Sequence, residues 1–274
     1  MHPLITGNTR VYGLIGDPLK SAKSPMLLNR LFAEAQTDAV CIPLEVGTQG
    51  LAEFVKGARA VRNLAGLLVT MPHKQAMLEV VDSLHPTARQ VGAINVVRCD
   101  RDGRWEGAVF DGLGCVLGMQ RQGVSLLGKS VLLVGAGGSG RAIAFAVAAA
   151  GARTLVISDL DPHRAAALAQ KAGNESSCNV HTGPADPAGH DIVINATPLG
   201  MNPDDPMPIV AERLTSAMVV VDIITRSEPT ALLLAAQARG CKTLNGEPMH
   251  LGQALLALSF LGFENIERRY SKGL

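Results

Sequence analysis

The chain alternates short apolar runs with longer stretches in which apolar residues recur at helical spacing. In its first part this pattern predicts strands and helices in turn. We expect the strands at residues 11–15, 39–44, 66–70, 93–98 and 105–109, and the helices at residues 24–35, 51–61, 74–84 and 86–91. Ser24 is the expected N-cap of its helix, because Pro25 in the first turn has no N–H to leave unpaired.

The alternation continues in the second part, which starts with a helix close to residue 111. We expect strands at residues 130–134, 154–158, 191–195, 218–222 and 242–244, and helices at residues 111–122, 140–150, 162–172, 230–239 and 249–262. Strands that alternate with helices are typical of an α/β fold with a mainly parallel sheet. The sequence therefore predicts two α/β domains, with a boundary that runs into the helix at residue 111.

Charge and composition exclude several classes of protein. The 274 residues include 25 basic and 24 acidic side chains, so the net charge of +1 gives no field for a nucleic acid or a membrane surface. The most apolar stretch, residues 142–151, is far shorter than the ~20 residues of a membrane span, and the first residues do not resemble a signal peptide. We expect a cytoplasmic monomer or homodimer with no nucleic-acid or membrane partner.

The spacing of cysteine and histidine residues predicts neither a metal site nor a disulfide framework. The five cysteines include no C-x-x-C pair, and the seven histidines include no H-x-x-x-H pair. His73 is expected on the surface, and nothing near Cys115 in the sequence would make its thiol a nucleophile.

A glycine-rich turn follows the strand at residues 130–134. Its cofactor-binding candidates are Gly135, Gly137, Gly138, Ser139 and Gly140. In dinucleotide-binding domains the first glycine of G-x-G-x-x-G permits a tight turn, the second lets the backbone approach a pyrophosphate, and the third lets the helix pack closely. The helix N-terminus adds free N–H donors for phosphate oxygens. The turn therefore predicts a Rossmann domain that binds a dinucleotide.

Asp159, at the end of the next strand, bears on the choice between NAD and NADP. A carboxylate there can accept hydrogen bonds from the adenosine ribose, whereas the 2′-phosphate of NADP would meet its negative charge. Asp161 adds a second negative charge, while Arg164 lies about one helical turn further and could fold back. We therefore expect NAD to be preferred and NADP to be the less favoured cofactor. The alternative role for Asp159, capping the next helix, fits Asp161 before Pro162 better.

Lys74 and Asp111 are the catalytic candidates in the first part. Lys74 follows a strand and a turn and begins a helical stretch, where its charge opposes the helix dipole. Asp111 stands among glycines after an apolar run. Each residue also has a plain structural interpretation, as a solvated helix end for Lys74 and as a helix N-cap for Asp111.

Several motifs together resemble the shikimate dehydrogenase family. In chain order they are Gly16-Asp-Pro, Ser24-Pro25, Val69-Thr70-x-Pro72-x-Lys74, Gly92-Ala93-x-Asn95, Asp111-Gly112, the glycine turn, Asn195-Ala-Thr197-Pro-Leu-Gly200-Met201, Asp222, and Gly246-x-x-Met249-x-x-x-Gln253. The resemblance covers almost the whole chain in one order, which makes it far more specific than the glycine turn alone.

The resemblance implies two domains that flank a cleft. Residues 1–110 and 247–274 would form a substrate-binding catalytic domain, and residues 111–246 a Rossmann domain for NAD(P). It also implies that Lys74 is the acid/base group at the reacting oxygen and that Asp111 is its partner. This chemistry is reasonable, because hydride transfer to a ketone develops an alkoxide that an ammonium group stabilises and then protonates.

The resemblance also assigns binding residues. Thr70, Asn95 and Gln253 match positions that hydrogen-bond the ring hydroxyls of the substrate, and Ser24 matches a serine that holds its carboxylate. The turns that contain Thr197, Met201 and Gly246 resemble those that contact the cofactor.

Three positions depart from the family pattern. The usual Ser-x-Ser-Pro is Ala22-Lys23-Ser24-Pro25 here, which leaves Ser21 as the neighbouring hydroxyl. Phe110 stands before Asp111 in place of a polar residue, and Thr225 replaces a tyrosine three residues after Asp222. We include Ser21 and Thr225 among the substrate-binding candidates and expect altered or weakened recognition of the carboxylate.

The sequence therefore predicts an NAD(P)-dependent oxidoreductase that interconverts shikimate and 3-dehydroshikimate, or a closely related cyclic polyhydroxy carboxylate. Quinate and aminoshikimate are alternative substrates. A different small-molecule dehydrogenase on the same scaffold, or a catalytically weak NAD-binding sensor whose substrate pocket has decayed, also remains open.

Overall fold

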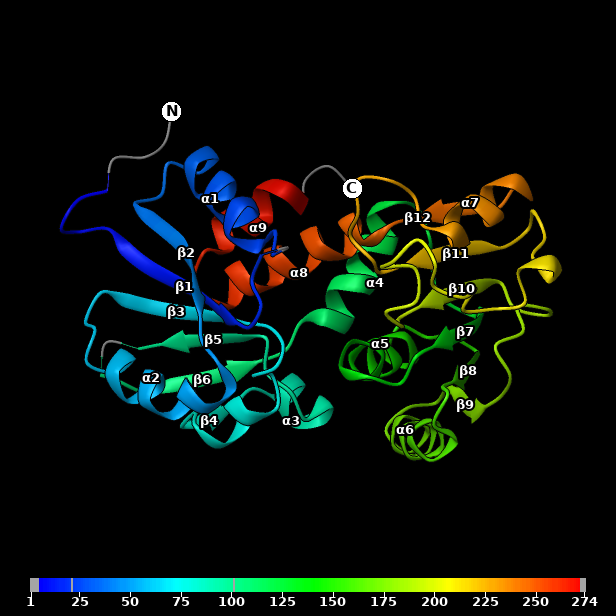
Figure 1. Cartoon of the computed structure of the whole chain (residues 1–274), viewed down its shortest axis with the longest axis horizontal. Helices are drawn as coiled ribbons and strands as arrows, with labels where there is room; N and C mark the ends of the chain where they lie inside the picture. The colour runs from blue at the N-terminus through cyan, green and yellow to red at the C-terminus, as the bar shows by residue number, and fades with distance from the viewer. Residues whose placement is uncertain (1–4, 21, 101, 272–274) are drawn as a thin grey trace. The chain divides into compact units, whose positions relative to one another are not determined.

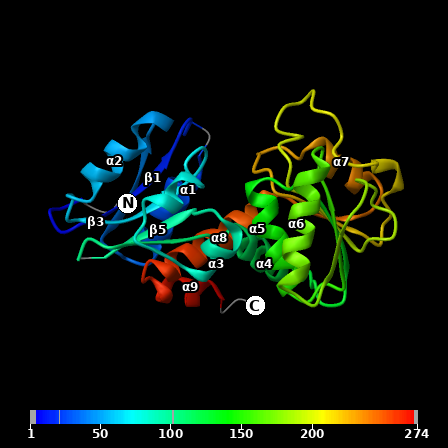
Figure 2. The same cartoon turned by 90° about the horizontal axis from the view of Figure 1, so that it is seen from below.

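The computed structural model describes residues 5–20, 22–100 and 102–271, and it divides into two compact units. Unit 1 contains the residues up to Phe110 and those from Ala254 onward, and unit 2 contains Asp111–Gln253. Both units are mixed α/β structures, each built on one sheet (Figures 1 and 2), which confirms the predicted fold class.

The sheet of unit 1 is mixed, with parallel strands on one side and antiparallel strands on the other. Its strands are β1 (Arg10–Gly16), β2 (Ala39–Glu45), β3 (Leu64–Val69), β4 (Ser83–Leu84), β5 (Val96–Cys99) and β6 (Trp105–Ala108). Within the described residues their spatial order is β2-β1-β3-β5-β6-β4. β1 pairs in parallel with β2 and β3, whereas β5 is antiparallel to both β3 and β6.

The helices of unit 1 bury apolar side chains against this sheet. They are α1 (Ser24–Glu34), α2 (Leu51–Ala58), α3 (Pro86–Val91) and α9 (Glu264–Ser271), with short 3-10 turns η1 (Thr48–Gly50) and η2 (Ala76–Glu79). Tyr12 of β1, Phe32 of α1 and Phe263 form a cluster of rings whose centroids lie 5.2–5.7 Å apart. The packing of these three rings fixes α1 and the C-terminal segment on one part of the core.

Residues 74–84 do not form the predicted α-helix. They contain the 3-10 turn η2 and the edge strand β4 instead. Asp82 draws this segment to the sheet edge, because its backbone N–H bonds to Trp105 O at 2.8 Å and its carboxylate accepts the Trp105 N–H at 2.7 Å. Hydrogen bonds from Arg59 and Trp105 hold the pKa of the Asp82 carboxyl below its usual range.

Unit 2 has the strand order of a doubly wound nucleotide-binding sheet. Its strands are β7 (Ser130–Val134), β8 (Thr154–Ser158), β9 (Asn179–Thr182), β10 (Ile192–Asn195), β11 (Val219–Asp222) and β12 (Lys242–Leu244). Within the described residues all neighbouring pairs are parallel, in the order β12-β11-β10-β7-β8-β9 (Figure 1). The order reverses between β10 and β7, and ligands of such sheets bind outside the carboxyl ends of the strands at that point.

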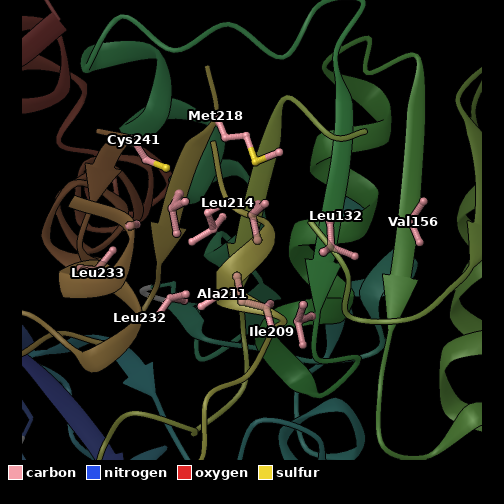
Figure 3. Close-up of a cluster of buried hydrophobic side chains, with 13 residues drawn as sticks. Leu132, Val156, Ile209, Ala211, Leu214, Met218, Leu232, Leu233 and Cys241 are labelled. Atoms are coloured by element: carbon pink, nitrogen blue, oxygen red, sulfur yellow. The ribbon is translucent and has the colours of Figure 1, made fainter. Parts of the chain in front are cut away.

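The hydrophobic core beside this sheet is formed by side chains from strands, a helix and loops. Figure 3 shows Leu132 of β7, Val156 of β8, Met218, Leu233 and Cys241 within one cluster of buried side chains. All five are less than a tenth exposed. The strands of a parallel sheet are buried on both faces, so their sequences are continuous apolar runs that can be recognised in the sequence. The observed bounds of β7 and β8 agree with their predicted ranges.

The helices of unit 2 are α4 (Asp111–Arg121), α5 (Gly138–Ala149), α6 (Pro162–Asn174), α7 (Ala231–Ala238) and α8 (Gly246–Phe260), with the 3-10 turn η3 (Ala211–Arg213). α5 contacts both α4 and α6. A Cβ at Gly112 of α4 would overlap the Ala142 carbonyl of α5, so these two helices approach as closely as backbones can. Across the described residues no helix is both long and apolar enough to span a bilayer.

The boundary between the units at α8 differs from the expected position at residue 247. Residues up to Gln253 belong to unit 2, because two glycines of α4 allow α8 to pack directly on its backbone. A Cβ at Gly114 would lie 2.5 Å from Gln253 N, and one at Gly118 would lie 2.5 Å from Pro248 C. These contacts assign the first half of α8 to unit 2.

We expect the stability of the protein to fall at alkaline pH. Burial raises the pKa of Cys41, Cys99, Cys115 and Tyr12 to about 12, above their values of 9.0 and 10.0 in an exposed setting. An acid whose pKa is higher in the folded state contributes stability that is present below the unfolded pKa and is lost as pH rises toward the folded one. Thermal unfolding between pH 7 and pH 11 should show a midpoint that decreases above about pH 9.

The matched control is a Cys41→Ala/Cys115→Ala variant, which removes two of these groups. Its midpoint should decrease less steeply over the same range. If the two proteins show parallel profiles, the buried thiols do not cause the loss.

Candidate active site

The glycine turn after β7 contains two glycines required by backbone packing and two that border open space. Gly135 has a φ of 103°, and a Cβ there would lie 2.9 Å from Ala196 C. A Cβ at Gly140 would overlap the carbonyl oxygen of Gly135. At Gly137 and Gly138, by contrast, a Cβ would have no atom within 4 Å. The N-terminal end of α5, where helix N–H groups have no partner within the helix, therefore borders open space.

The carboxylate of Asp159 links the glycine turn to the end of β8 through hydrogen bonds. Its Oδ2 accepts a hydrogen bond from the Ala136 N–H at 2.6 Å, and its Oδ1 accepts one from the Asp161 N–H at 2.9 Å. Arg164 Nη1 lies 3.8 Å from Oδ1. The side chain is only 10% exposed, so both carboxylate oxygens serve the protein itself. Asp161 is the N-cap of α6, as predicted, and accepts from the N–H groups of His163 and Arg164.

The turn after β10 adjoins the glycine turn. Ala196 approaches Gly135, and Thr197 donates its hydroxyl proton to Asn195 Oδ1 at 2.6 Å. Met201, further along the same loop, is 59% exposed. Thr197 and Met201 therefore belong to the loop at the point where the strand order reverses, and their contact with a cofactor stays a prediction.

Thr225 and Gly246 come together at the same sheet edge. A Cβ at Gly246 would lie 2.7 Å from Thr225 Oγ1 and would overlap the Ile223 carbonyl. The Gly246 N–H donates to Ile224 O at 3.1 Å. Only glycine permits this approach of the start of α8 to the loop that follows β11.

Lys74 lies in unit 1, in the turn that follows β3. The His73 N–H donates to Thr70 O at 3.0 Å, and Lys74 O accepts from the Ile94 N–H at 2.8 Å. The expectation that His73 lies on the surface is wrong: the residue is 1% exposed, and its Nε2 lies 2.6 Å from Val46 O. The buried imidazole anchors the turn that presents the half-buried Lys74.

Asn95 and Thr70 lie close to Lys74 in unit 1. Asn95 is 2% exposed, its Oδ1 accepts the Phe110 N–H at 3.1 Å, and its carbonyl accepts the Val69 N–H at 2.8 Å. Asn95 therefore also holds the chain just before Asp111. The structure thus brings Thr70, Lys74 and Asn95 together at the end of β3.

Ser24 is not the N-cap that the sequence suggested. Lys23 occupies the cap position of α1 without a capping side-chain hydrogen bond, and Ser24 is the first helical residue. The Ala22 N–H donates to Leu19 O at 2.9 Å within the loop before it. Ser21 lies outside the described residues.

Asp111 and Gln253 belong to unit 2. Asp111 is the first residue of α4 and is 3% exposed. Gln253 lies against Gly114, one turn further along α4. Lys74 and Asp111 therefore come from different units, so their catalytic pairing stays a prediction.

Two polar residues of unit 2 received no role from the sequence. Asp222 ends β11 and is fully buried, and burial raises the pKa of its carboxyl. Arg226 donates from Nη1 to Gly200 O at 2.9 Å and so holds the loop that contains Met201. The signal for Asp222 was present in the sequence, because a carboxylate directly follows three valines of a buried strand.

Comparison with protein families matches both units. Residues 14–97 match a family described as the shikimate dehydrogenase substrate binding domain, and residues 118–225 match shikimate / quinate 5-dehydrogenase. A protein of Rubrobacter xylanophilus named shikimate dehydrogenase (NADP(+)) is 38% identical over 93% of this chain and 91% of its own length. The chain belongs to the shikimate dehydrogenase family. A relative of the same name in Thermococcus kodakarensis is 37% identical over 87% of this chain and 85% of its own length.

Two solved structures share the fold of this chain. The structure of a shikimate dehydrogenase in complex with NADP+ has a TM-score of 0.89 and 30% identity, and the match covers 98% of this chain and 96% of that one. The ligand-free 5-ketofructose reductase of a Gluconobacter strain has a TM-score of 0.84 and 30% identity, covering 95% of this chain and 98% of that one. Both similarities extend over nearly the full chain.

The expected preference for NAD is contradicted by these relatives, which are named as NADP(+)-dependent enzymes. A preference for NAD would need a free carboxylate at the adenosine ribose. In the structure both oxygens of Asp159 accept backbone hydrogen bonds, and the guanidinium of Arg164 lies beside it. The charge of Asp159 is therefore compensated locally, and its presence does not exclude a 2′-phosphate.

We expect Gly140→Ala and Gly138→Ala to differ sharply in stability. The first places a Cβ onto the Gly135 carbonyl, whereas the second places it where no atom lies within 4 Å. Overpacking of this kind costs about 1–3 kcal/mol, so Gly140→Ala should lower the free energy of unfolding by that amount in a urea titration.

Gly138→Ala is the matched control in the same turn and should unfold at the same urea concentration as the unmodified protein, or slightly above it. Equal stabilities of the two variants would show that the contact between Gly140 and Gly135 does not constrain the turn.

Proposed function

We propose that this chain is a shikimate dehydrogenase that interconverts 3-dehydroshikimate and shikimate with NADP. The similarity to relatives named shikimate dehydrogenase (NADP(+)) over 93% of the chain carries the proposal. The retained candidates Lys74, Asp111 and Gln253 support it. The open space at Gly137 and Gly138, before the N-terminus of α5, fits a dinucleotide pyrophosphate.

Lys74 is the proposed acid/base group. When bound, the nicotinamide cofactor supplies or accepts the hydride at the substrate carbon. In the reducing direction Lys74 stabilises the developing alkoxide with its ammonium group and donates a proton from Nζ to the oxygen. In the oxidising direction the neutral amine removes the hydroxyl proton. The buried carboxylate of Asp111 is the proposed partner that orients the ammonium group.

The cofactor site in this proposal uses Arg164 for the 2′-phosphate of NADP. The guanidinium lies 3.8 Å from Asp159 Oδ1 and 3.7 Å from Asp161 Oδ2, and its side chain is 56% exposed. An exposed arginine that is only loosely paired can turn to a phosphate, which binds a guanidinium through charge-assisted hydrogen bonds. Ser139, Thr197, Met201 and Gly246 complete the proposed contacts with the cofactor.

Substrate recognition is assigned to polar residues of both units. Thr70, Asn95 and Gln253 are the proposed partners of the ring hydroxyls, with Ser24 and Thr225 near the carboxylate. Ala22 provides no hydroxyl for that carboxylate. A lost hydrogen bond to a charged group costs about 1.5–3 kcal/mol, which corresponds to roughly 10- to 150-fold in affinity.

A second candidate function is the reduction of an uncharged polyhydroxy ketone. Two observations favour it: Ala22 removes a hydroxyl from the proposed carboxylate subsite, and the solved 5-ketofructose reductase shares the fold at 30% identity. A neutral substrate needs no hydroxyl at position 22, so the same Lys74 chemistry would act on a ketone without an acid group.

The function is tested by initial rates with shikimate, quinate, aminoshikimate and a neutral ketohexose, each with NADP(H) and NAD(H). We expect the highest kcat/KM for shikimate with NADP. Ala22→Ser should lower KM for shikimate at nearly constant kcat, because the carboxylate is remote from the reacting carbon and is bound equally in ground and transition states.

The other outcomes identify the alternatives. A higher kcat/KM for the neutral ketose, unaffected by Ala22→Ser, would favour the second function. Tight binding of a dinucleotide without turnover of any of these substrates would reject both and leave a cofactor-binding sensor.

We expect Lys74→Ala to reduce kcat by a factor on the order of 10²–10⁴, the usual contribution of a general acid–base group. The dissociation constant of NADP, measured by fluorescence titration, should change little. The matched control is Lys56→Ala, which removes an exposed lysine of α2 in the same unit. Near-normal kcat for Lys74→Ala, or an equal loss in the control, would require another proton donor.

A further inference from the structure

A buried carboxylate connects three segments at the carboxyl edge of the unit 2 sheet. Asp222 is 0% exposed. Its Oδ1 accepts hydrogen bonds from the Ile224 N–H at 3.1 Å and from Asn195 Nδ2 at 3.2 Å, and its Oδ2 accepts the Thr230 hydroxyl proton at 2.7 Å. These partners come from the loop after β11, the end of β10 and the N-cap of α7.

The direction of donation at Asp222 is fixed by chemistry. An ionised carboxylate accepts hydrogen bonds and donates none, so all three neighbours must donate to it. Thr230 then presents an oxygen lone pair to the Leu233 N–H at 3.3 Å and caps α7. Asn195 must turn its amide nitrogen toward Asp222 and its amide oxygen away.

The orientation of the Asn195 amide determines which hydrogen bonds form in the next loop. Its Nδ2 also donates to Leu199 O at 3.1 Å, while its Oδ1 accepts from Thr197 N at 3.1 Å and from Thr197 Oγ1 at 2.6 Å. Thr197 Oγ1 in turn accepts the Leu199 N–H at 3.1 Å. The side-chain hydrogen bonds within residues 195–199 thus depend, directly or through the Thr197 hydroxyl, on which way the amide faces.

This loop lies where a dinucleotide binds in sheets of this order. β10 and β7 are neighbours across the reversal of strand order, and Ala196 approaches the backbone of Gly135 in the glycine turn. We propose that Asp222 is a positioning residue: through the amide of Asn195 it holds residues 196–199 in the conformation that receives the cofactor. The ligand part of this proposal rests on the proposed function.

Stability alone does not account for a carboxylate at this position. Removing a charge from water is costly, and apolar residues of similar volume are often as stabilising as a buried polar network. A carboxylate can accept hydrogen bonds at two oxygen atoms, which neither an apolar group nor an amide can do. Asparagine at position 222 would turn an NH₂ group toward at least one existing donor, so either the Asn195 amide would have to turn round or the Thr230 hydroxyl would have to accept where it now donates.

The variant Asp222→Asn tests the proposal. In the cofactor-free protein we expect the amide protons of Thr197 and Leu199 to exchange with deuterium about tenfold faster, because their acceptors depend on the Asn195 amide. We also expect the dissociation constant of NADP, from fluorescence titration, to rise about tenfold. If asparagine prevents folding, Thr230→Val removes a single donor and should shift both quantities in the same direction, whereas Thr230→Ser should restore them.

Asp191→Asn is the matched control. Its carboxylate accepts the Ser130 N–H at 2.8 Å, at the start of β7 and therefore at the opposite edge of the same sheet. This variant should lose stability without faster exchange at Thr197 and Leu199 and without weaker NADP binding. Unchanged exchange in Asp222→Asn and Thr230→Val, or equal effects in Asp191→Asn, would overturn the proposal.

The two measurements, amide exchange and the dissociation constant of NADP, test this proposal separately from the proposed function. If the unmodified chain binds no NADP, the proposed function and the ligand part fail, while the exchange rates still decide whether Asp222 orders the loop. If NADP binds with the same affinity in Asp222→Asn although exchange is faster, the loop does not receive the cofactor and the proposal is rejected.

Discussion

The carboxyl edge of the unit 2 sheet depends on backbones that approach more closely than side chains allow. Gly140 meets the Gly135 backbone, Gly135 meets the Ala196 backbone, and Gly246 meets the loop after β11. A Cβ at any of these positions would collide with main-chain atoms, which cannot move aside as the end of a side chain can. The turns after β7, β10 and β11 are therefore packed as a single layer.

Two carboxylates complete that layer by accepting hydrogen bonds from within the protein. Asp159 joins the glycine turn to β8, and Asp222 joins β10, β11 and α7. Both stand at the end of an apolar strand, where the side chain leaves the core and reaches the free N–H groups of the next turn. A carboxylate in this position can orient a loop as readily as it can contact a ligand, and its hydrogen-bond partners distinguish the two roles.

Unit 1 anchors its candidate residues by other means. The buried ring of His73 bonds to the Val46 carbonyl, and Asn95 holds the Phe110 N–H. Phe110 itself packs its ring against His85 and Phe260, with centroids 5.9 and 5.7 Å away. The backbone before Asp111 is thus held by the hydrogen bond to Asn95 and by the packing of the Phe110 ring.

The sequence by itself determined the alternation of strands and helices, the glycine turn and the family, because these depend on local periodicity and on the order of short motifs. It missed β9, whose side chains are mostly exposed, and it assigned residues 74–84 to a helix that long-range bonds to Trp105 replace with a 3-10 turn and an edge strand. Only the tertiary structure decided that His73 is buried and that the Asp159 carboxylate accepts hydrogen bonds from the protein's own N–H groups. The physical reason is the same in each case. A polar side chain forms hydrogen bonds with the groups that folding brings close to it. Those groups are distant in the sequence, or their positions depend on the conformation of the backbone.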